Sequence, residues 1–429
     1  MEQNLITAYR FLYQSTRKHP KVIRIRMRLA DPIEPGVLES AAKTTMKRYP
    51  YFCVELRKRG TEYYYAYNPR PVAVIHSEEG AELNSEETNF HLIAFSWYDD
   101  WITMDVFHGL TDGTGAYEVI RTLLWYYCRA RYCTDLPADG VRLFGDTIPQ
   151  EEWDDPIRTL AYDAPSSQKR APALDLIHKG ALENDGEQTV ISISVPEKAF
   201  MKFSRDNDGS PGTMVSLFLA RAIHGMYPEA EDPIRISLCV NQRKALRAPL
   251  AHQSLVGSVL LEYKQAMQNW PLSMQATAMR GMTILGTDED AVLGGAARQK
   301  ANALRYITLS SNAKRRELAE SESAVMLRSQ TATVSYVGKA GYGWMERYIK
   351  DFRTFALGEV PLLIEISAVN GWFSLDFIQH FSSFIYAEAF LEELRRNGID
   401  YHIRAVEKLG IPNVRLPWSI PSSVENIQK

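Results

Sequence analysis

The feature that most constrains the fold of this 429-residue chain is a change in hydrophobic period between residues 101 and 127. Up to residue 108, apolar side chains alternate, which is typical of a strand with one buried face. From residue 116 onward they recur at three- and four-residue intervals, which indicates an amphipathic helix. His108 ends the strand pattern, and Asp112-Gly113 stands directly before the helix. A strand that turns sharply into a helix favours an α/β fold.

The same mixture of strands and helices recurs along both halves of the chain. In the first half the patterns predict helices at about 4–18 and 35–49 and strands at 21–29, 61–68 and 90–109. In the second half they predict strands at 187–196, 233–241, 331–338 and 361–380, helices at 198–206, 213–227 and 382–398, and a helix-rich stretch that runs to about residue 328. Asn370-Gly371 predicts a two-residue hairpin turn, because both positions accept positive φ. Arg24, Arg26 and Arg28 alternate with apolar residues, so we expect their strand to have one buried side.

The length of the chain indicates two domains, because one hydrophobic core rarely serves more than about 250 to 300 residues. Residues 148–187 are rich in proline, acidic and small polar residues and show weak periodicity. We therefore interpret this segment as the crossover between an N-terminal subdomain, residues 1–165, and a C-terminal subdomain, residues 166–429. Each is expected to be a mixed sheet with helices packed on it.

Composition excludes several classes of partner and cofactor. The net charge is −3, with no basic stripe, so we expect no nucleic acid and no anionic membrane surface as a partner. The sequence contains no run of 18 apolar residues, so no membrane span is predicted. The four cysteines form no CxxC pair, and the first 20 residues lack a signal-peptide pattern, which together favour a cytoplasmic protein. No GxGxxG after a strand, P-loop or HExxH occurs, so we infer no nicotinamide, ATP or metal requirement.

The residues around His108 are suited to acid–base chemistry. A neutral imidazole can take a proton near pH 7, and the end of a strand is a rigid mount for it. Asp112 could pair with an arginine and lock the turn, and Gly113 would allow a close backbone approach. The alternative is purely structural: Asp112 as a helix N-cap, Gly113 as a turn residue and His108 as a core histidine. The motif alone does not choose between these two interpretations.

The segment resembles the HHxxxDG signature of the acyltransferase superfamily with the chloramphenicol acetyltransferase-like fold, which includes condensation domains and alcohol acetyltransferases. Further segments similar to the alcohol acetyltransferase-like branch follow in the expected order: VNQRKAL at 240–246, VGSVLLEY at 256–263, TATVSYVGKAG at 331–341 and ISAVNGWFSLDF at 366–377. The resemblance spans nearly the whole chain. It implies two chloramphenicol acetyltransferase-like subdomains with a tunnel between them.

The resemblance also implies roles for individual residues. His108 would be the general base, and Asp112 would hold the loop through a salt bridge. Arg243 is the candidate partner of Asp112, with Arg24 and Arg26 as alternatives. Ser335 is a candidate oxyanion donor, although an ordinary strand serine is the competing interpretation. The two other histidines considered, His224 and His252, are interpreted as structural.

Three residues depart from the family pattern. Phe107 stands where the signature usually has its first histidine, and Tyr336 and Ser258 replace asparagines of two later motifs.

The leading hypothesis is transfer of an acyl group from acyl-CoA, a co-substrate and not a tightly bound cofactor, to a small alcohol or amine. The alternatives are a stand-alone condensation domain fed by an acyl carrier protein and a non-catalytic binding member of the fold.

Overall fold

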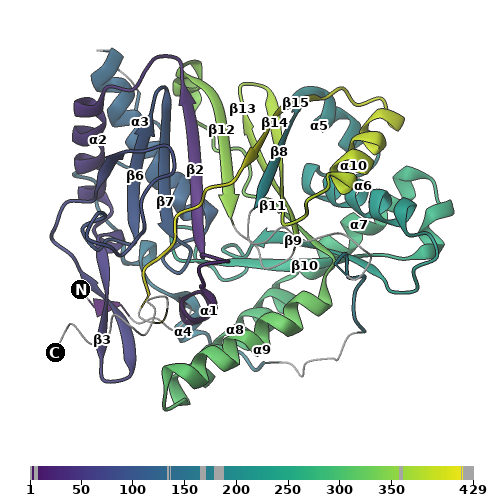
Figure 1. Ribbon diagram of the computed structural model, residues 1–429, viewed down its shortest axis with the longest axis horizontal. Coiled ribbons are helices and arrows are strands. Elements are labelled where there is room, and N and C mark those ends of the chain that lie inside the picture. Colours follow the sequence, from purple (N-terminus) through teal and green to yellow (C-terminus); the bar gives the residue numbers. More distant parts are fainter. Residues whose placement is uncertain are drawn as a thin grey trace.

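A computed structural model of the chain describes residues 2–3, 8–132, 135, 137–164, 171–177, 188–356, 361–416 and 418. Two large sheets lie side by side, each with helices packed on it (Figure 1). This arrangement confirms the α/β class and the two mixed sheets flanked by helices. The boundary predicted between residues 165 and 166 falls outside the described residues.

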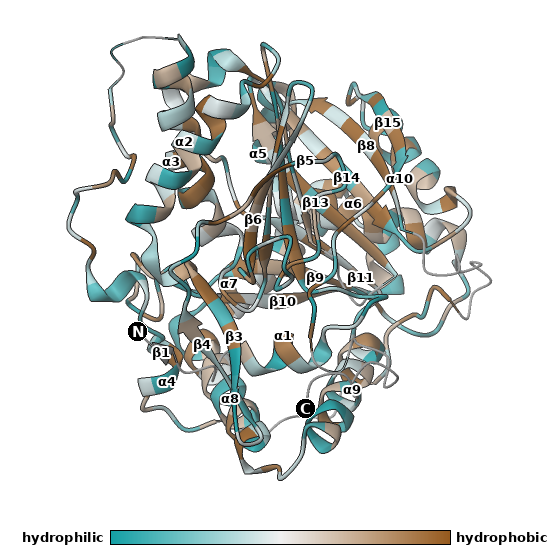
Figure 2. Ribbon diagram, turned by 60° about the vertical axis from the view of Figure 1, so that its left-hand side comes forward, coloured by the Kyte–Doolittle hydropathy of each residue, from teal (hydrophilic) through white to brown (hydrophobic). Residues whose placement is uncertain are grey.

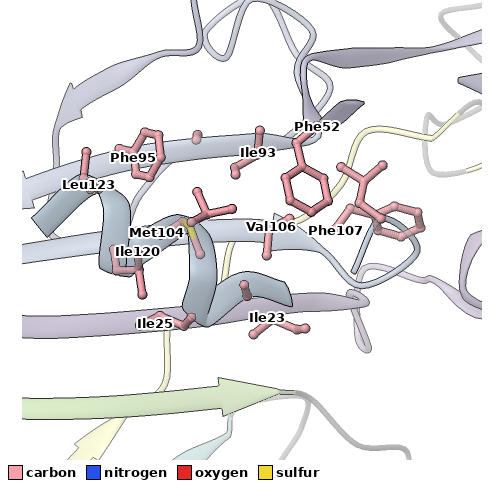
Figure 3. Packing of buried hydrophobic residues seen from close by; sticks show 14 of the residues in the cluster. Ile23, Ile25, Phe52, Ile93, Phe95, Met104, Val106, Phe107, Ile120 and Leu123 are labelled. Carbon is pink, nitrogen blue, oxygen red and sulfur yellow. The ribbon is translucent and has the colours of Figure 1, made fainter. Parts of the chain in front are cut away.

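The first large sheet has five strands in the order β12-β2-β7-β6-β5. Its strands are β2 (Val22–Leu29), β5 (Val74–His76), β6 (Ile93–Tyr98), β7 (Trp101–Phe107) and β12 (Ile349–Ala356). Two helices, α2 (Pro35–Arg48) and α3 (Gly113–Tyr132), pack against each other and cover this sheet (Figure 1). Ile120 and Leu123 of α3 pack over strand residues such as Ile25 and Phe95 (Figure 3). The apolar stripe predicted for this helix therefore faces the core of the first half.

A small antiparallel sheet lies beside the five-stranded one. It consists of β1 (Glu2–Gln3), β4 (Glu62–Tyr67) and β3 (Val54–Arg59), in that order. Short 3-10 turns in the described part of the chain include Pro50–Phe52, Gln150–Glu152, Gln265–Asn269 and Gly343–Tyr348, and a four-residue helix, α4, spans Pro156–Thr159.

The second large sheet has seven strands in the order β10-β9-β11-β13-β14-β8-β15. They are β8 (Thr189–Pro196), β9 (Ile234–Asn241), β10 (Val256–Tyr263), β11 (Ala332–Tyr336), β13 (Leu362–Val369), β14 (Trp372–Gln379) and β15 (His402–Lys408). Helices α5 (Glu197–Asp206), α6 (Pro211–Met226), α7 (Leu272–Gly286) and α10 (Ile385–Arg396) complete this half. Strands β8 and β11 are largely hydrophobic, as expected for the centre of a core (Figure 2).

The predicted hairpin at residues 361–380 is confirmed. β13 and β14 pair in register from Leu362–Gln379 to Val369–Trp372, and φ is 50° at Asn370 and 77° at Gly371. Both angles lie in the left-handed region that a type I′ turn requires.

Separate segments of the second half contact the first. β12 pairs antiparallel with β2, so the first sheet is completed by a strand from the C-terminal part of the chain. After β15 the chain runs back along the first half, where Val414 forms a bridge with Leu83. A long helical hairpin, α8 (Glu289–Thr308) and α9 (Asn312–Ser329), also contacts α1 (Tyr9–Gln14) of the first half (Figure 1). These connections hold the two sheets together around the space between them.

The arginine-bearing face of β2 differs from the prediction of a strand with only one buried side. Arg24 is 3% exposed, and its guanidinium forms a salt bridge of 2.7 Å with Asp105 of β7. Arg26 lies over the ring of Trp101, 4.6 Å from its centroid. At Arg24 this face is covered by the returning C-terminal segment, whose Gly410 carbonyl accepts a hydrogen bond from Arg24, whereas Arg28 at the other end of the strand is exposed, as predicted. Burial of an arginine is tolerated here because a carboxylate lies opposite it.

Candidate active site

His108 is held by backbone contacts directly after β7. Its N–H donates to the Lys21 carbonyl at 2.7 Å, and its Nδ1 lies 3.0 Å from the Thr111 carbonyl oxygen. A carbonyl only accepts hydrogen bonds, so Nδ1 carries the proton and Nε2 keeps its lone pair. The ring of Phe11 in α1 stacks on the imidazole, with centroids 4.3 Å apart. The position and the tautomer of the ring are therefore both fixed.

Burial controls the charge of this histidine. It lowers the pKa of His108 to about 4, because the imidazolium form is desolvated and because Arg10 and Lys21 also disfavour it. The carboxylate of Asp112 opposes this shift only in part. The ring is thus neutral above about pH 5 and able to accept a proton through Nε2.

Asp112 anchors the turn that follows His108. Its carboxylate receives two hydrogen bonds from the Arg243 guanidinium, at 2.8 and 2.9 Å, and one from the Leu255 N–H at 2.8 Å. It also accepts from the N–H groups of Thr114 and Gly115, at 3.0 and 3.2 Å, and so caps the start of α3. The side chains of Asp112 and Arg243 are each 5% exposed. Of the three arginines considered for Asp112, the structure places Arg243 beside it.

Gly113 lies where a side chain would collide with the second half of the molecule. A Cβ added there would be 2.5 Å from Cγ2 of Val337, the residue that follows β11. The approach of the two halves at this point therefore requires a glycine.

His252 supports the same turn from behind. Its carbonyl accepts a hydrogen bond of 2.7 Å from the Thr111 hydroxyl, and its Nδ1 lies 2.6 Å from the Tyr51 hydroxyl. Its side chain is buried, which lowers its pKa to about 3. His224, in contrast, is half-buried on α6 and contacts Gln268. Neither residue lines the space beside His108.

A cavity of about 940 Å³ opens in front of His108 and is lined by both halves of the chain. His108, Gly113 and Thr114 form part of one wall, and the seven-stranded sheet forms another. Its sheet wall includes Ser237, Cys239, Ser258, Thr333, Ser335, Tyr336 and Glu365, and α8 and α9 add residues at its edge. Ser335 and both residues that depart from the family asparagines, Ser258 and Tyr336, thus face the same cavity as His108.

Phe107 does not face this cavity. It is fully buried and belongs to the apolar cluster of the first half that also contains Phe52 (Figure 3). Adjacent residues of a strand point to opposite sides, so the position before His108 belongs to the core. The absence of the first signature histidine therefore leaves this cavity wall unchanged.

Glu365 on β13 is a cavity residue that the sequence analysis missed. Glu365 is 3% exposed, and burial raises the pKa of its carboxyl group to about 8. A hydrogen bond with Ser335 lowers this pKa in part, and the charge of Asp376 raises it further. The available signal was a single acidic residue within an otherwise apolar strand, LLIEISAV.

The part of the chain that the structure describes contains neither a candidate metal site nor a candidate membrane-spanning helix. There, no three His, Cys, Asp or Glu side chains are grouped so that they could hold a metal ion. Nor does this part contain a helix with the length and apolar character needed to cross a membrane.

Comparison with known proteins identifies the fold. No protein-family model and no curated protein matches the sequence. Among solved structures, TRI101 of F. sporotrichioides, complexed with coenzyme A and T-2, matches with a TM-score of 0.60 at 12% identity, over 95% of this chain and 99% of that one. Polyketide synthase associated protein 5 of Mycobacterium tuberculosis matches with a TM-score of 0.57 at 13% identity, over 92% and 96% of the two chains.

The first condensation domain of the CDA synthetase also matches, with a TM-score of 0.56 at 12% identity, over 92% of this chain and 95% of that one. All three similarities extend over nearly the full length of both proteins. The chain therefore has the two-lobed fold of the chloramphenicol acetyltransferase-like and condensation-domain superfamily.

Proposed function

We propose that the protein is an acyltransferase that moves an acyl group from a thioester to an alcohol or amine, with His108 as general base. The observation that carries this proposal is the state of the His108 ring. It is neutral, it is held in one tautomer by the Thr111 carbonyl, and it faces a cavity large enough for two small reactants.

In this reaction the acceptor hydroxyl or amine donates its proton to Nε2 of His108 while its oxygen or nitrogen attacks the thioester carbonyl. A bond from the acceptor to the carbonyl carbon forms, and the carbon–sulfur bond then breaks. The imidazolium returns the proton to the departing thiolate, so the ring is neutral again at the end. No covalent acyl-enzyme is needed.

Asp112 and Ser335 have supporting parts in this proposal. Asp112 holds the turn through Arg243 and does not touch substrate. Ser335 lines the cavity and is the candidate donor to the oxyanion, a contact worth roughly 2 to 4 kcal/mol in acyl transfer. In the resting protein its hydroxyl is engaged with Glu365, so it must rotate to take this part.

Acyl-CoA is the proposed donor, supported by the structural likeness to TRI101, which was solved with coenzyme A bound. A carrier-fed condensation reaction is the second candidate, supported by the likeness to the condensation domain of the CDA synthetase. The two candidates share His108 and differ in what delivers the thioester.

The test is a thiol-release assay on the purified protein with acetyl-CoA and longer acyl-CoAs, against a panel of alcohols and amines. We expect acceptor-dependent release that falls by roughly 10²- to 10⁴-fold in His108→Ala. His224→Ala, which removes a histidine outside the cavity, is the matched control and should keep the rate.

Release that persists undiminished in His108→Ala would overturn the general-base role. Release only when the acyl group is loaded on a carrier protein would favour the second candidate. A folded protein that is inactive with both donors would leave the non-catalytic binding member of the fold as the better account.

A further inference from the structure

A second titratable group lines the cavity, and the proposed reaction does not use it. Glu365 lies on β13, directly beside Ser335 of β11 and opposite Asp376 of β14 in the strand register. Its carboxyl group is almost completely buried and faces the cavity that His108 also lines.

The neighbouring acid, Asp376, is a buried carboxylate whose charge has a cationic partner within the protein. Asp376 is fully buried, and one of its oxygens lies 2.9 Å from the Arg353 guanidinium and 2.5 Å from the Ser192 hydroxyl. The charge of this aspartate is therefore balanced by a cation of the protein.

Glu365 has no such cation. Across the described ranges no lysine or arginine side chain pairs with it, and its protein partner is the Ser335 hydroxyl. The sheet residues around this part of the cavity, Ser237, Cys239 and Thr333, are neutral. The basic residues that line the same cavity, Arg10, Lys21 and Arg298, come from other segments, and none of them is among the groups that shift the pKa of Glu365. An ionised carboxylate in such surroundings is costly unless a positive charge is brought to it.

A ligand can bring that charge, because the carboxyl group faces open space. A protonated amine is the natural complement: it is compact, carries up to three donors, and forms a charge-assisted hydrogen bond with a carboxylate. Burial has already raised the pKa of this group, so the arrival of a cation would favour loss of its proton to solvent.

We propose that Glu365 makes the cavity selective for acceptors that carry an ammonium group in addition to the hydroxyl or amine that attacks the thioester. The acceptor class is thus an amino alcohol or a diamine, with one end held at Glu365 and the other presented to His108. This inference rests on the proposed acyl transfer and specifies its acceptor.

The test compares matched acceptors in wild type and Glu365→Gln. Amino alcohols of two to six carbons are paired with n-alkanols in which a methyl group replaces the ammonium, and products are identified by mass spectrometry. In the wild type we expect kcat/KM to favour the best amino alcohol by about tenfold or more, because its ammonium group forms a charge-assisted hydrogen bond that the alkanol cannot form.

In Glu365→Gln this preference should disappear, mainly through a higher KM for the amino alcohol, so that the ratio of the kcat/KM values for the amino alcohol and the alkanol falls to about one. Glu322→Gln is the matched control. Glu322 also lines the cavity, but it already accepts a hydrogen bond of 2.8 Å from the Tyr306 hydroxyl, so this variant should keep the preference.

An equal loss for both acceptors, or a wild type that prefers neither, would overturn the selectivity while leaving acyl transfer intact. If no acyl transfer is found with any acceptor, calorimetric binding of 1,6-diaminohexane still decides the inference. A roughly tenfold weaker affinity in Glu365→Gln supports it, and equal affinity in the two proteins overturns it.

Discussion

Two carboxyl groups, Asp112 and Glu365, line one cavity and have opposite electrostatic surroundings. Asp112 receives a bidentate contact from Arg243 and three backbone N–H groups. Glu365 has one hydroxyl partner, and Asp376 lies across the strand pair from it. The first group is fully compensated by the protein, and the second is not.

This difference separates two kinds of buried acid. A compensated carboxylate fixes a loop, because moving it would break several hydrogen bonds at once. An uncompensated carboxyl at a cavity wall costs free energy in the empty protein and is expected at a site where a ligand relieves that cost. Asp112 therefore belongs to the support of His108, and Glu365 belongs to recognition of the acceptor.

Removing the charge of Asp112 should have the largest effect on stability. In Asp112→Asn the Arg243 guanidinium stays buried without a full counter-charge, which costs about 3 to 5 kcal/mol. We expect this loss in the free energy of unfolding measured by urea denaturation, together with loss of acyl transfer as His108 loses its support.

Asp105→Asn is the matched control for this variant. Asp105 pairs with Arg24 in an equally buried salt bridge but lies outside the turn after His108. It should lose comparable stability and keep activity at temperatures where it is folded. A loss below about 1 kcal/mol in Asp112→Asn would contradict the assignment of Asp112 as the fully compensated group.

The turn after His108 could be predicted from sequence because its chemistry is local. A strand period, a histidine and an Asp-Gly pair before a helix all lie within about 20 residues, and the order of later motifs pointed to Arg243. The role of Glu365 could not be found this way, because whether its carboxyl group has a cationic partner depends on strands that are distant in the sequence. Only the assembled sheet shows that Arg353 pairs with Asp376 and leaves Glu365 without a cation.

The same reasoning explains why strand β12 was missed. The segment of β12 contains Lys350, Asp351 and Arg353, and these charges argue locally against a buried strand. Its charges are balanced by residues far along the chain, such as Arg404 beside Asp351. Strand β10 was also missed, within a stretch predicted to be helix-rich. The hairpin at Asn370-Gly371, in contrast, was predictable because its turn chemistry is contained in two residues.

A smaller effect is expected where the turn that carries Asp112 meets the sheet that carries Glu365. In Gly113→Ala the new methyl group would lie 2.5 Å from Cγ2 of Val337, so the two walls of the cavity must move apart. Overpacking of this kind costs about 1 to 3 kcal/mol. We expect that loss by urea denaturation, with a fall in kcat/KM. Adding Val337→Ala should restore most of the lost stability and most of the lost kcat/KM. If the double variant is no more stable and no more active than Gly113→Ala, the strain does not come from the contact with Val337.

The smallest effect concerns the pH dependence that the uncompensated carboxyl gives to the fold. With a folded pKa of about 8 and an unfolded value of about 4.3, Glu365 binds more protons in the folded state between these limits, so wild-type stability falls as pH rises through them. Glu365→Gln does not titrate. Its stability relative to wild type should therefore increase from pH 7 to pH 8, by about 1 kcal/mol.

Urea denaturation of both proteins at the two pH values measures this difference. Glu322→Gln keeps Glu365, so it should keep the pH dependence that Glu365 gives to wild type. Asp376 lies opposite Glu365 on β14 and is paired with Arg353, and both residues are present in the two proteins, so their charges are common to the comparison. If instead the variant loses stability relative to wild type as pH rises, Glu365 is stabilised as a carboxylate by the protein itself. It would then be a compensated acid like Asp112, and the contrast between the two walls of the cavity would fail.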